Sequence, residues 1–136
     1  RVVLGIPVNS PIKKISDLNG KVIWIQCAHE VPCGAVADAA LKSENVSTKP
    51  VSYEPKASSV LAKLLAGEVD AAIIYRTDMI ANAKKIRAIE FNDQESAKTT
   101  YQIAQLRKNR WAASFMNYLN SKEVLKIMVQ KGFEVK

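Results

Sequence analysis

The chain has 136 residues, of which 48% are hydrophobic and 24% are charged, and its formal net charge is +7. This length supports one domain with a buried core, and the composition excludes intrinsic disorder and a coiled coil. The positive charge alone is compatible with nucleic acid, an acidic membrane or an anionic small ligand as partner. Because the basic residues are dispersed and no recognition-helix motif accompanies them, we expect no nucleic-acid binding.

Strand and helix patterns alternate along the chain. Short apolar runs between turn residues predict strands, and apolar residues at helical spacing predict helices. This alternation predicts an α/β fold of three layers, with a mainly parallel sheet and flanking helices. In chain order, the expected elements are a strand over 1–8, a helical turn over 16–20, a strand over 21–25, a helix over 33–43, a strand over 51–53, a helix that opens within 55–59 and ends at Gly67, a strand over 69–75, a helix over 79–83, strands over 87–91 and 101–106, and helices over 109–120 and 122–131.

Two expected strand-to-helix junctions carry features of an anion site. Ligands of such sheets bind at the carboxyl ends of the strands, where helix starts offer free N–H groups and the positive end of the helix dipole. Proline marks the helix start in Val31-Pro32-Cys33-Gly34 and again in the segment 55–59. Tyr75 ends a buried strand, from which its hydroxyl can donate into a cleft. Each junction alone is better explained as an ordinary helix start, and Tyr75 alone is equally compatible with a role as an aromatic cap on the core.

The segment from Cys27 to Cys33 holds the remaining chemically active side chains. The two cysteines are compatible with one disulfide or with two free thiols. Together with His29 they have the spacing C-x-H-x3-C, which matches no common zinc arrangement, so we expect no metal site. Cys33 as a nucleophile with His29 as its base is the enzymatic alternative, but no residue that would orient the histidine is apparent. We therefore expect neither catalysis nor a cofactor.

Taken together, four segments resemble the molybdate-binding subfamily of type II periplasmic binding proteins. They occur in the expected order and span nearly the whole chain, although Cys33 stands where the family usually has a small residue. The segments are Ile15-Ser16-Asp17-Leu18-Asn19-Gly20-Lys21, His29-Glu30-Val31-Pro32-Cys33-Gly34, Glu68 to Asp78, and Lys131-Gly132-Phe133.

The resemblance implies a non-enzymatic protein that captures a tetrahedral oxyanion, molybdate or tungstate, for an ABC importer. In that family neutral donors hold the anion. Carried over by motif, the ligand-binding residues are Cys33 and Ala57, through their backbone N–H groups, and Tyr75, through its hydroxyl. Two serines from a first lobe would complete the set.

The resemblance also implies how the chain is organised. Residues 1–100 would form the second lobe of a bilobal protein, and residues 101–136 a tail of one strand and two helices that packs toward the first lobe. About eighty further residues are then expected before Arg1. Without the first lobe, we expect either exposed apolar surface or a dimer that covers it.

The expected setting follows from the same family. We expect a periplasmic or extracellular protein, lipid-anchored through the segment before Arg1, whose partner is the membrane permease. In that oxidising compartment, Cys27 and Cys33 are expected to form a disulfide.

Two alternatives to this function stay open on sequence grounds. The chain could be the effector-sensing domain of a transcription regulator, which shares the fold but would need a helix-turn-helix before Arg1. It could also bind another anion, such as sulfate, phosphate or an organic acid.

Overall fold

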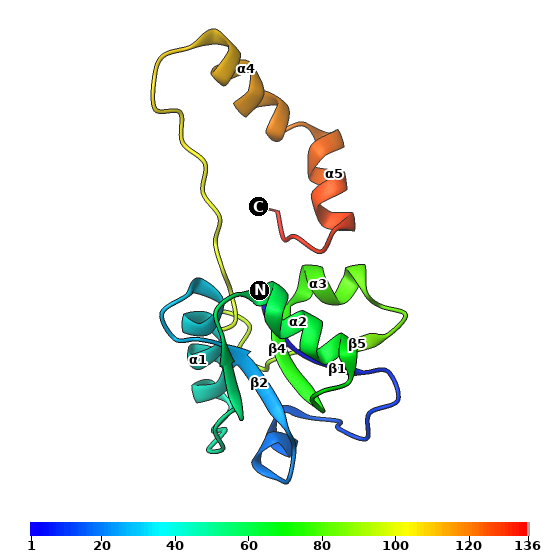
Figure 1. The fold of residues 1–136 in the computed structure, drawn as a ribbon. Coiled ribbons are helices and arrows are strands. Elements are labelled where there is room, and N and C mark those ends of the chain that lie inside the picture. Colours follow the sequence, from blue (N-terminus) through cyan, green and yellow to red (C-terminus); the bar gives the residue numbers. More distant parts are fainter. Residues whose placement is uncertain (136) are drawn as a thin grey trace. The chain divides into compact units, whose positions relative to one another are not determined.

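The computed structural model describes residues 1–135 and divides into two compact units, residues 1–99 and residues from 100 onward (Figure 1). In the first unit the described residues form one sheet of five strands, in the order β3-β2-β4-β1-β5. Helices cover both faces of this sheet, so the predicted α/β class with three layers is confirmed. The strands are β1 (Val2–Pro7), β2 (Trp24–Cys27), β3 (Ser52–Glu54), β4 (Ala71–Tyr75) and β5 (Ile86–Ile89), and the helices are η1 (Ile15–Asn19), α1 (Pro32–Ser43), α2 (Ala57–Ala66) and α3 (Arg76–Ala81).

The sheet is mixed, because β1 runs against the other four strands. β2 pairs in parallel with both β3 and β4, whereas β1 pairs antiparallel with β4 and with β5. Four strands therefore point the same way, as a mainly parallel sheet requires. The reversal of β1 does not show in the sequence, because a strand buried on both faces has the same apolar pattern in either direction.

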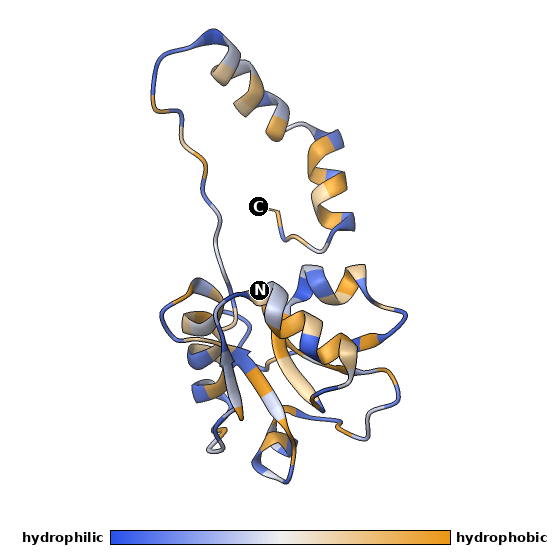
Figure 2. Ribbon diagram, viewed as in Figure 1, coloured by the Kyte–Doolittle hydropathy of each residue, from blue (hydrophilic) through white to orange (hydrophobic). Residues whose placement is uncertain are grey.

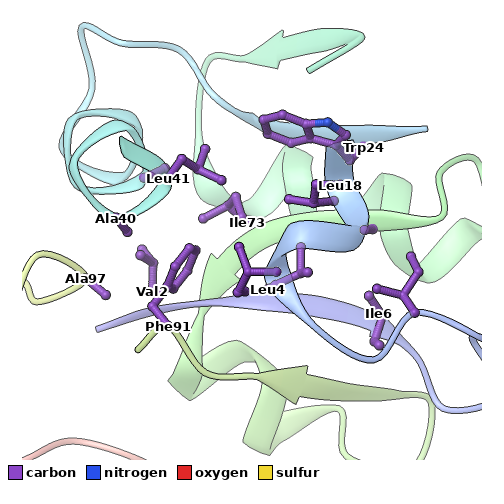
Figure 3. Close-up of a cluster of buried hydrophobic side chains, with 14 residues drawn as sticks. Val2, Leu4, Ile6, Leu18, Trp24, Ala40, Leu41, Ile73, Phe91 and Ala97 are labelled. Carbon is purple, nitrogen blue, oxygen red and sulfur yellow. The ribbon is translucent and has the colours of Figure 1, made fainter. Parts of the chain in front are cut away.

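The core consists of two apolar clusters, one on each face of the sheet. Side chains alternate across a strand, so Val2, Leu4 and Ile6 face α1 while Val3 faces α2. Figure 3 shows the cluster under α1, where Trp24 and Phe91 are fully buried. The residues of α2 that pack on the opposite face include Val60 and Leu64. Burial on both faces fixes the sheet and holds the ends of its strands at defined positions.

The bounds of β2 and α3 differ from the prediction by up to three residues, and those of the other elements in this unit by one or two at most. β2 begins at Trp24 instead of Lys21 and extends to Cys27 instead of ending at Ile25, because Gln26 and Cys27 pair with β3. α3 begins at Arg76 instead of Met79, directly after β4. The end of α2 at Gly67 is confirmed: this glycine has φ 74°, a left-handed conformation that side chains disfavour.

The second unit contains α4 (Arg110–Leu119) and α5 (Lys122–Gln130). Figure 2 shows apolar and hydrophilic residues interspersed along both helices. The predicted strand over 101–106 is wrong, since these residues form no regular structure here. A strand needs a neighbouring strand to bond its backbone groups, and in the described part of the chain none pairs with this segment. Among the described residues, no helix is long and apolar enough to cross a membrane.

Candidate functional site

The predicted site residues lie at the carboxyl edge of the sheet. Cys27 pairs with Glu54 across β2 and β3, and Ile25 pairs with Ala72 across β2 and β4, so these three parallel strands end level with one another. Helices α1, α2 and α3 begin after those ends, within five residues of each strand. Three helix starts are therefore gathered at one edge, the usual position of ligands in α/β sheets.

A disulfide ties the start of α1 to the end of β2. Cys27 and Cys33 are bridged, with their Cα atoms 5.7 Å apart, so the predicted disulfide is confirmed. Both residues are buried in the cluster under α2. The bridge fixes the second residue of α1 against the strand and leaves neither sulfur as a thiol that could attack a substrate or bind a metal.

Gly34 lets α1 approach the strand end this closely. A Cβ atom at this position would lie 1.9 Å from the carbonyl oxygen of Ala28 and 2.9 Å from that of Cys27. Both contacts are to backbone atoms, which cannot rotate away. The glycine is therefore required by the packing of the helix start on the loop between the bridged cysteines, referred to below as the bridged loop.

His29, which belongs to the bridged loop, contacts a residue of α1 and a residue of β3. Its Nδ1 lies 2.5 Å from Asp38 Oδ2, and its ring lies 4.6 Å from the ring of Tyr53 on β3. The other oxygen of Asp38 accepts a hydrogen bond of 2.7 Å from Gln26 Nε2. Asp38 is thus the partner of His29 that the sequence did not reveal. Because Cys33 is bridged to Cys27, the His29–Asp38 pair has no thiol to activate.

A buried carboxylate at the end of β3 bonds to the last turn of α2. Glu54 Oε1 accepts hydrogen bonds from Lys63 Nζ at 2.6 Å and from Ser52 Oγ at 2.7 Å. The Lys63 ammonium, followed by the Ser52 hydroxyl, lowers the pKa of the Glu54 carboxyl. Because Lys63 lies on α2, this ion pair ties the helix to the strand that precedes Ala57.

Tyr75 ends β4 and is the residue immediately before α3. Its side chain is half-buried and packs against both core clusters. Its backbone N–H donates to the side chain of Asp78 in the first turn of α3. Partial burial raises the pKa of the Asp78 carboxyl, and this hydrogen bond opposes the rise.

The three predicted residues all contact or belong to the core cluster under α2. Cys33 is a member of the cluster under α2, and both Ala57 and Tyr75 pack against that cluster. Their role in binding stays a prediction.

Donor groups at this edge are not occupied by side-chain caps. In the described structure, α1, α2 and α3 have no side-chain cap at their N-termini. By contrast, Asn109 and Ser121 cap α4 and α5 with their side chains. The Arg76 N–H at the start of α3 already donates to the carbonyl oxygen of Arg1. The N–H groups at the uncapped starts of α1 and α2 can serve an external acceptor, so this edge can bind an anion through neutral donors.

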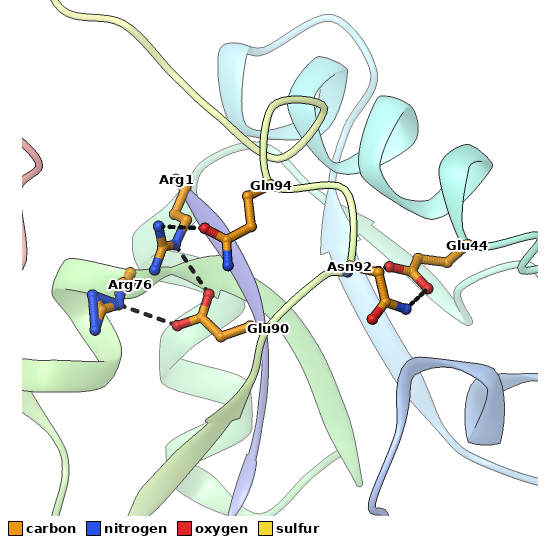
Figure 4. A network of polar contacts seen from close by, with 6 residues as sticks. All are labelled: Arg1, Glu44, Arg76, Glu90, Asn92 and Gln94. Carbon is orange, nitrogen blue, oxygen red and sulfur yellow. Dashed lines mark hydrogen bonds and ion pairs between the residues drawn. The ribbon is translucent and has the colours of Figure 1, made fainter.

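A charged network that the sequence did not predict lies at the same edge (Figure 4). Glu90 bonds both Arg1, at 3.0 Å, and Arg76, at 3.2 Å. No local pattern indicates it, because the residues are distant in sequence and meet only through the pairing of β1 with β4 and β5. Among the described residues, no group of three or more histidine, cysteine, aspartate or glutamate side chains is arranged to hold a metal ion.

Comparison with known proteins connects this geometry to one family. The sequence model of the bacterial extracellular solute-binding proteins matches residues 1–134. The molybdate-binding protein ModA of Mycobacterium tuberculosis (strain H37Rv) is 27% identical over 112 residues, which cover 80% of this chain and 43% of that protein. YvgL of Bacillus subtilis (strain 168), assigned as an ABC transporter substrate-binding lipoprotein, is 26% identical over 141 residues, covering 97% of this chain and 54% of that protein. The chain therefore spans about half the length of these relatives.

Solved structures share the fold. A substrate-binding domain assigned to a molybdenum ABC transporter of Clostridium difficile superposes with a TM-score of 0.73 at 22% identity, over 99% of this chain and 63% of that one. Peb3 of Campylobacter jejuni gives a TM-score of 0.71 at 18% identity, over 99% and 66% of the two chains. At these identities the likeness concerns the fold alone.

Proposed function

Since the chain belongs to the family of bacterial extracellular solute-binding proteins, we propose that the complete protein captures a tetrahedral oxyanion and delivers it to the permease of an ABC importer. The proposed ligand is molybdate or tungstate, two ions of equal charge and nearly equal size. The molybdate-binding relative in Mycobacterium tuberculosis supports this choice. Capture and release break no covalent bond, so the proposal includes neither catalysis nor a cofactor.

One observation carries the proposal: two uncapped helix starts and a strand-end tyrosine share the carboxyl edge of the sheet. The proposed donors are the N–H groups of Cys33 and Ala57 and the hydroxyl of Tyr75. A backbone N–H can only donate a hydrogen bond, so it suits a fully deprotonated oxyanion and leaves the O–H of a protonated one without an acceptor. The disulfide and the Gly34 contact hold the first donor in place before the ligand arrives, which lowers the cost of ordering it.

The proposed place of action is outside the cytoplasm. The family consists of extracellular proteins, and the lipoprotein assignment of YvgL supports a lipid anchor on the complete protein. An oxidising compartment also agrees with the bridged cysteines.

Calorimetric titration of the full-length protein with molybdate, tungstate, sulfate and phosphate tests this function. We expect molybdate and tungstate to bind with similar affinity, and sulfate and phosphate to bind at least about tenfold more weakly, a difference of roughly 1.4 kcal/mol. Tighter binding of sulfate, phosphate or an organic acid would refute the proposed ligand, and no binding of any anion would refute the function.

A further inference from the structure

Two arginines, Arg1 and Arg76, share the carboxylate of Glu90 (Figure 4). Arg1 Nε lies 3.0 Å from Glu90 Oε2, and Arg76 Nε lies 3.2 Å from Glu90 Oε1. Arg1 also donates from its Nη1 to Gln94 Oε1 at 3.1 Å. Each carboxylate oxygen of Glu90 therefore has its own guanidinium partner.

This network is close to the proposed donors. Arg76 follows Tyr75 in the chain, and its backbone N–H donates to the carbonyl oxygen of Arg1 at 3.0 Å. Glu90 follows β5, which is two strands from β4 in the sheet. At about 4.8 Å per strand, its backbone is about 10 Å from that of Tyr75. That separation slightly exceeds the screening length of about 8 Å at physiological salt, so charge at Glu90 acts on an anion there most strongly at low salt.

The charges around Tyr75 compensate one another. The side chains of Arg1, Arg76 and Glu90 are 15%, 32% and 36% exposed, so solvent screens them only in part. Asp78, in the first turn of α3, supplies a second carboxylate. Only Glu90 bonds the two arginines, but the formal charge of these four side chains sums to zero.

We infer that Glu90 sets the charge balance of the oxyanion site. By pairing with Arg1 and Arg76 it keeps their charge from acting on the ligand, so that neutral donors dominate binding. Removal of its charge raises the summed formal charge of Arg1, Arg76, Asp78 and Glu90 from zero to +1 beside Tyr75. This inference rests on the proposed function and deepens it, because it names a residue that tunes affinity without belonging to the donor set.

The test uses the full-length protein with Glu90→Gln and Arg76→Gln, titrated with molybdate and sulfate at low and at physiological salt. Glu90→Gln should tighten binding of both dianions about three- to tenfold at low salt, and Arg76→Gln should weaken it by a similar factor. Both effects should shrink as salt rises. A merely structural network predicts instead that both variants weaken binding, at every salt concentration.

Matched controls carry the same charge changes at the opposite edge of the sheet. Glu68→Gln and Lys85→Gln alter exposed residues that precede β4 and β5. Glu68 is roughly 20 Å along the chain from Tyr75, about twice as far as Glu90, so these variants should change binding much less than the network variants at low salt and not at all at physiological salt.

The outcomes separate this inference from the function on which it rests. If wild-type protein binds sulfate but not molybdate, the proposed ligand is wrong. The sulfate affinities of the two network variants then still test the role of Glu90. Equal affinity of Glu90→Gln and wild type, or weakening by both network variants, overturns the inference. If no dianion binds even at millimolar concentration, the function and the inference are both wrong.

Discussion

At the scale of single residues, Tyr75 is the donor that a substitution can remove most cleanly. Its ring packs against both core clusters, and phenylalanine would keep that packing. We therefore expect Tyr75→Phe in the full-length protein to weaken molybdate binding by about 1–3 kcal/mol, the range for a hydrogen bond to a charged group, without loss of the fold. Tyr53→Phe is the control, because Tyr53 lies on β3 outside the proposed donor set and should bind molybdate like wild type. Equal calorimetric affinities of the wild type, Tyr75→Phe and Tyr53→Phe would show that Tyr75 only covers the core and does not bind the anion.

Gly34 provides a second prediction at this scale. A methyl group there would overlap the backbone of Ala28 and Cys27, so α1 would have to move away from β2. We expect Gly34→Ala to destabilise the protein by about 2 kcal/mol or more, despite the better helix propensity of alanine. Gly20→Ala is the control, since its Cβ would meet a single atom, Asp17 O, at 3.2 Å. Thermal unfolding compares the two variants, and equal melting temperatures would show that the close approach at Gly34 is not needed.

At the scale of elements, the Glu54–Lys63 pair predicts how the contact of β3 with α2 responds to acid. The pKa of Glu54 is lowered in the folded state, so the folded protein favours the ionised carboxylate. The stability that it contributes is present in full above about pH 4.5, its ordinary value, and is lost as the pH falls through the folded-state pKa. Urea unfolding between pH 7 and pH 3 measures this loss. Glu54→Gln keeps the size of the side chain without the charge and should make the loss of stability at low pH smaller. The same pH dependence in the variant and the wild type would show that the ion pair does not stabilise the fold.

The disulfide gives a second prediction for elements, because it joins β2 to α1. Its short loop predicts a contribution of about 2 kcal/mol to the free energy of unfolding. The double variant Cys27→Ser with Cys33→Ser should lose this amount and should bind molybdate more weakly, by less than Tyr75→Phe does. Thiol titration of denatured, unreduced wild-type protein should find no free thiol. Two thiols per chain would contradict the bridge.

The order and type of the elements in the first unit could be predicted from the sequence, because apolar runs and helical spacing are local signals. The two Pro-marked helix starts and Tyr75 could be found in the same way. Strand direction could not, since β1 is reversed by its pairing and not by its composition. The pairings of Asp38 with His29, and of Glu90 with two arginines, also needed the structure, because they join residues from different elements.

The wrong prediction of a strand over 101–106 has a different physical cause. Alternating apolar residues there, such as Tyr101 and Ile103, satisfy the strand pattern, but both side chains are exposed. A pattern predicts where a strand can form, whereas its formation needs a partner edge.

At the scale of the whole molecule, we expect the 136-residue chain alone to bind molybdate poorly. One edge with three proposed donors leaves the rest of the anion in water, and hydration competes with these hydrogen bonds. Calorimetry of the isolated chain beside the full-length protein checks this. Because the isolated chain must first be folded, its circular dichroism is the control, and sub-micromolar affinity of a folded isolated chain would contradict a two-lobe site.

The central claim is that the anion binds at the carboxyl edge through neutral donors of α1 and α2. The most direct measurement is a molybdate titration of ¹⁵N-labelled full-length protein, followed through the backbone amide signals of Cys33 and Ala57. Both signals should shift on binding and saturate at the calorimetric stoichiometry, while the capped helix start at Val124 should stay unchanged. Binding by calorimetry with unmoved Cys33 and Ala57 signals would place the ligand elsewhere and contradict the account.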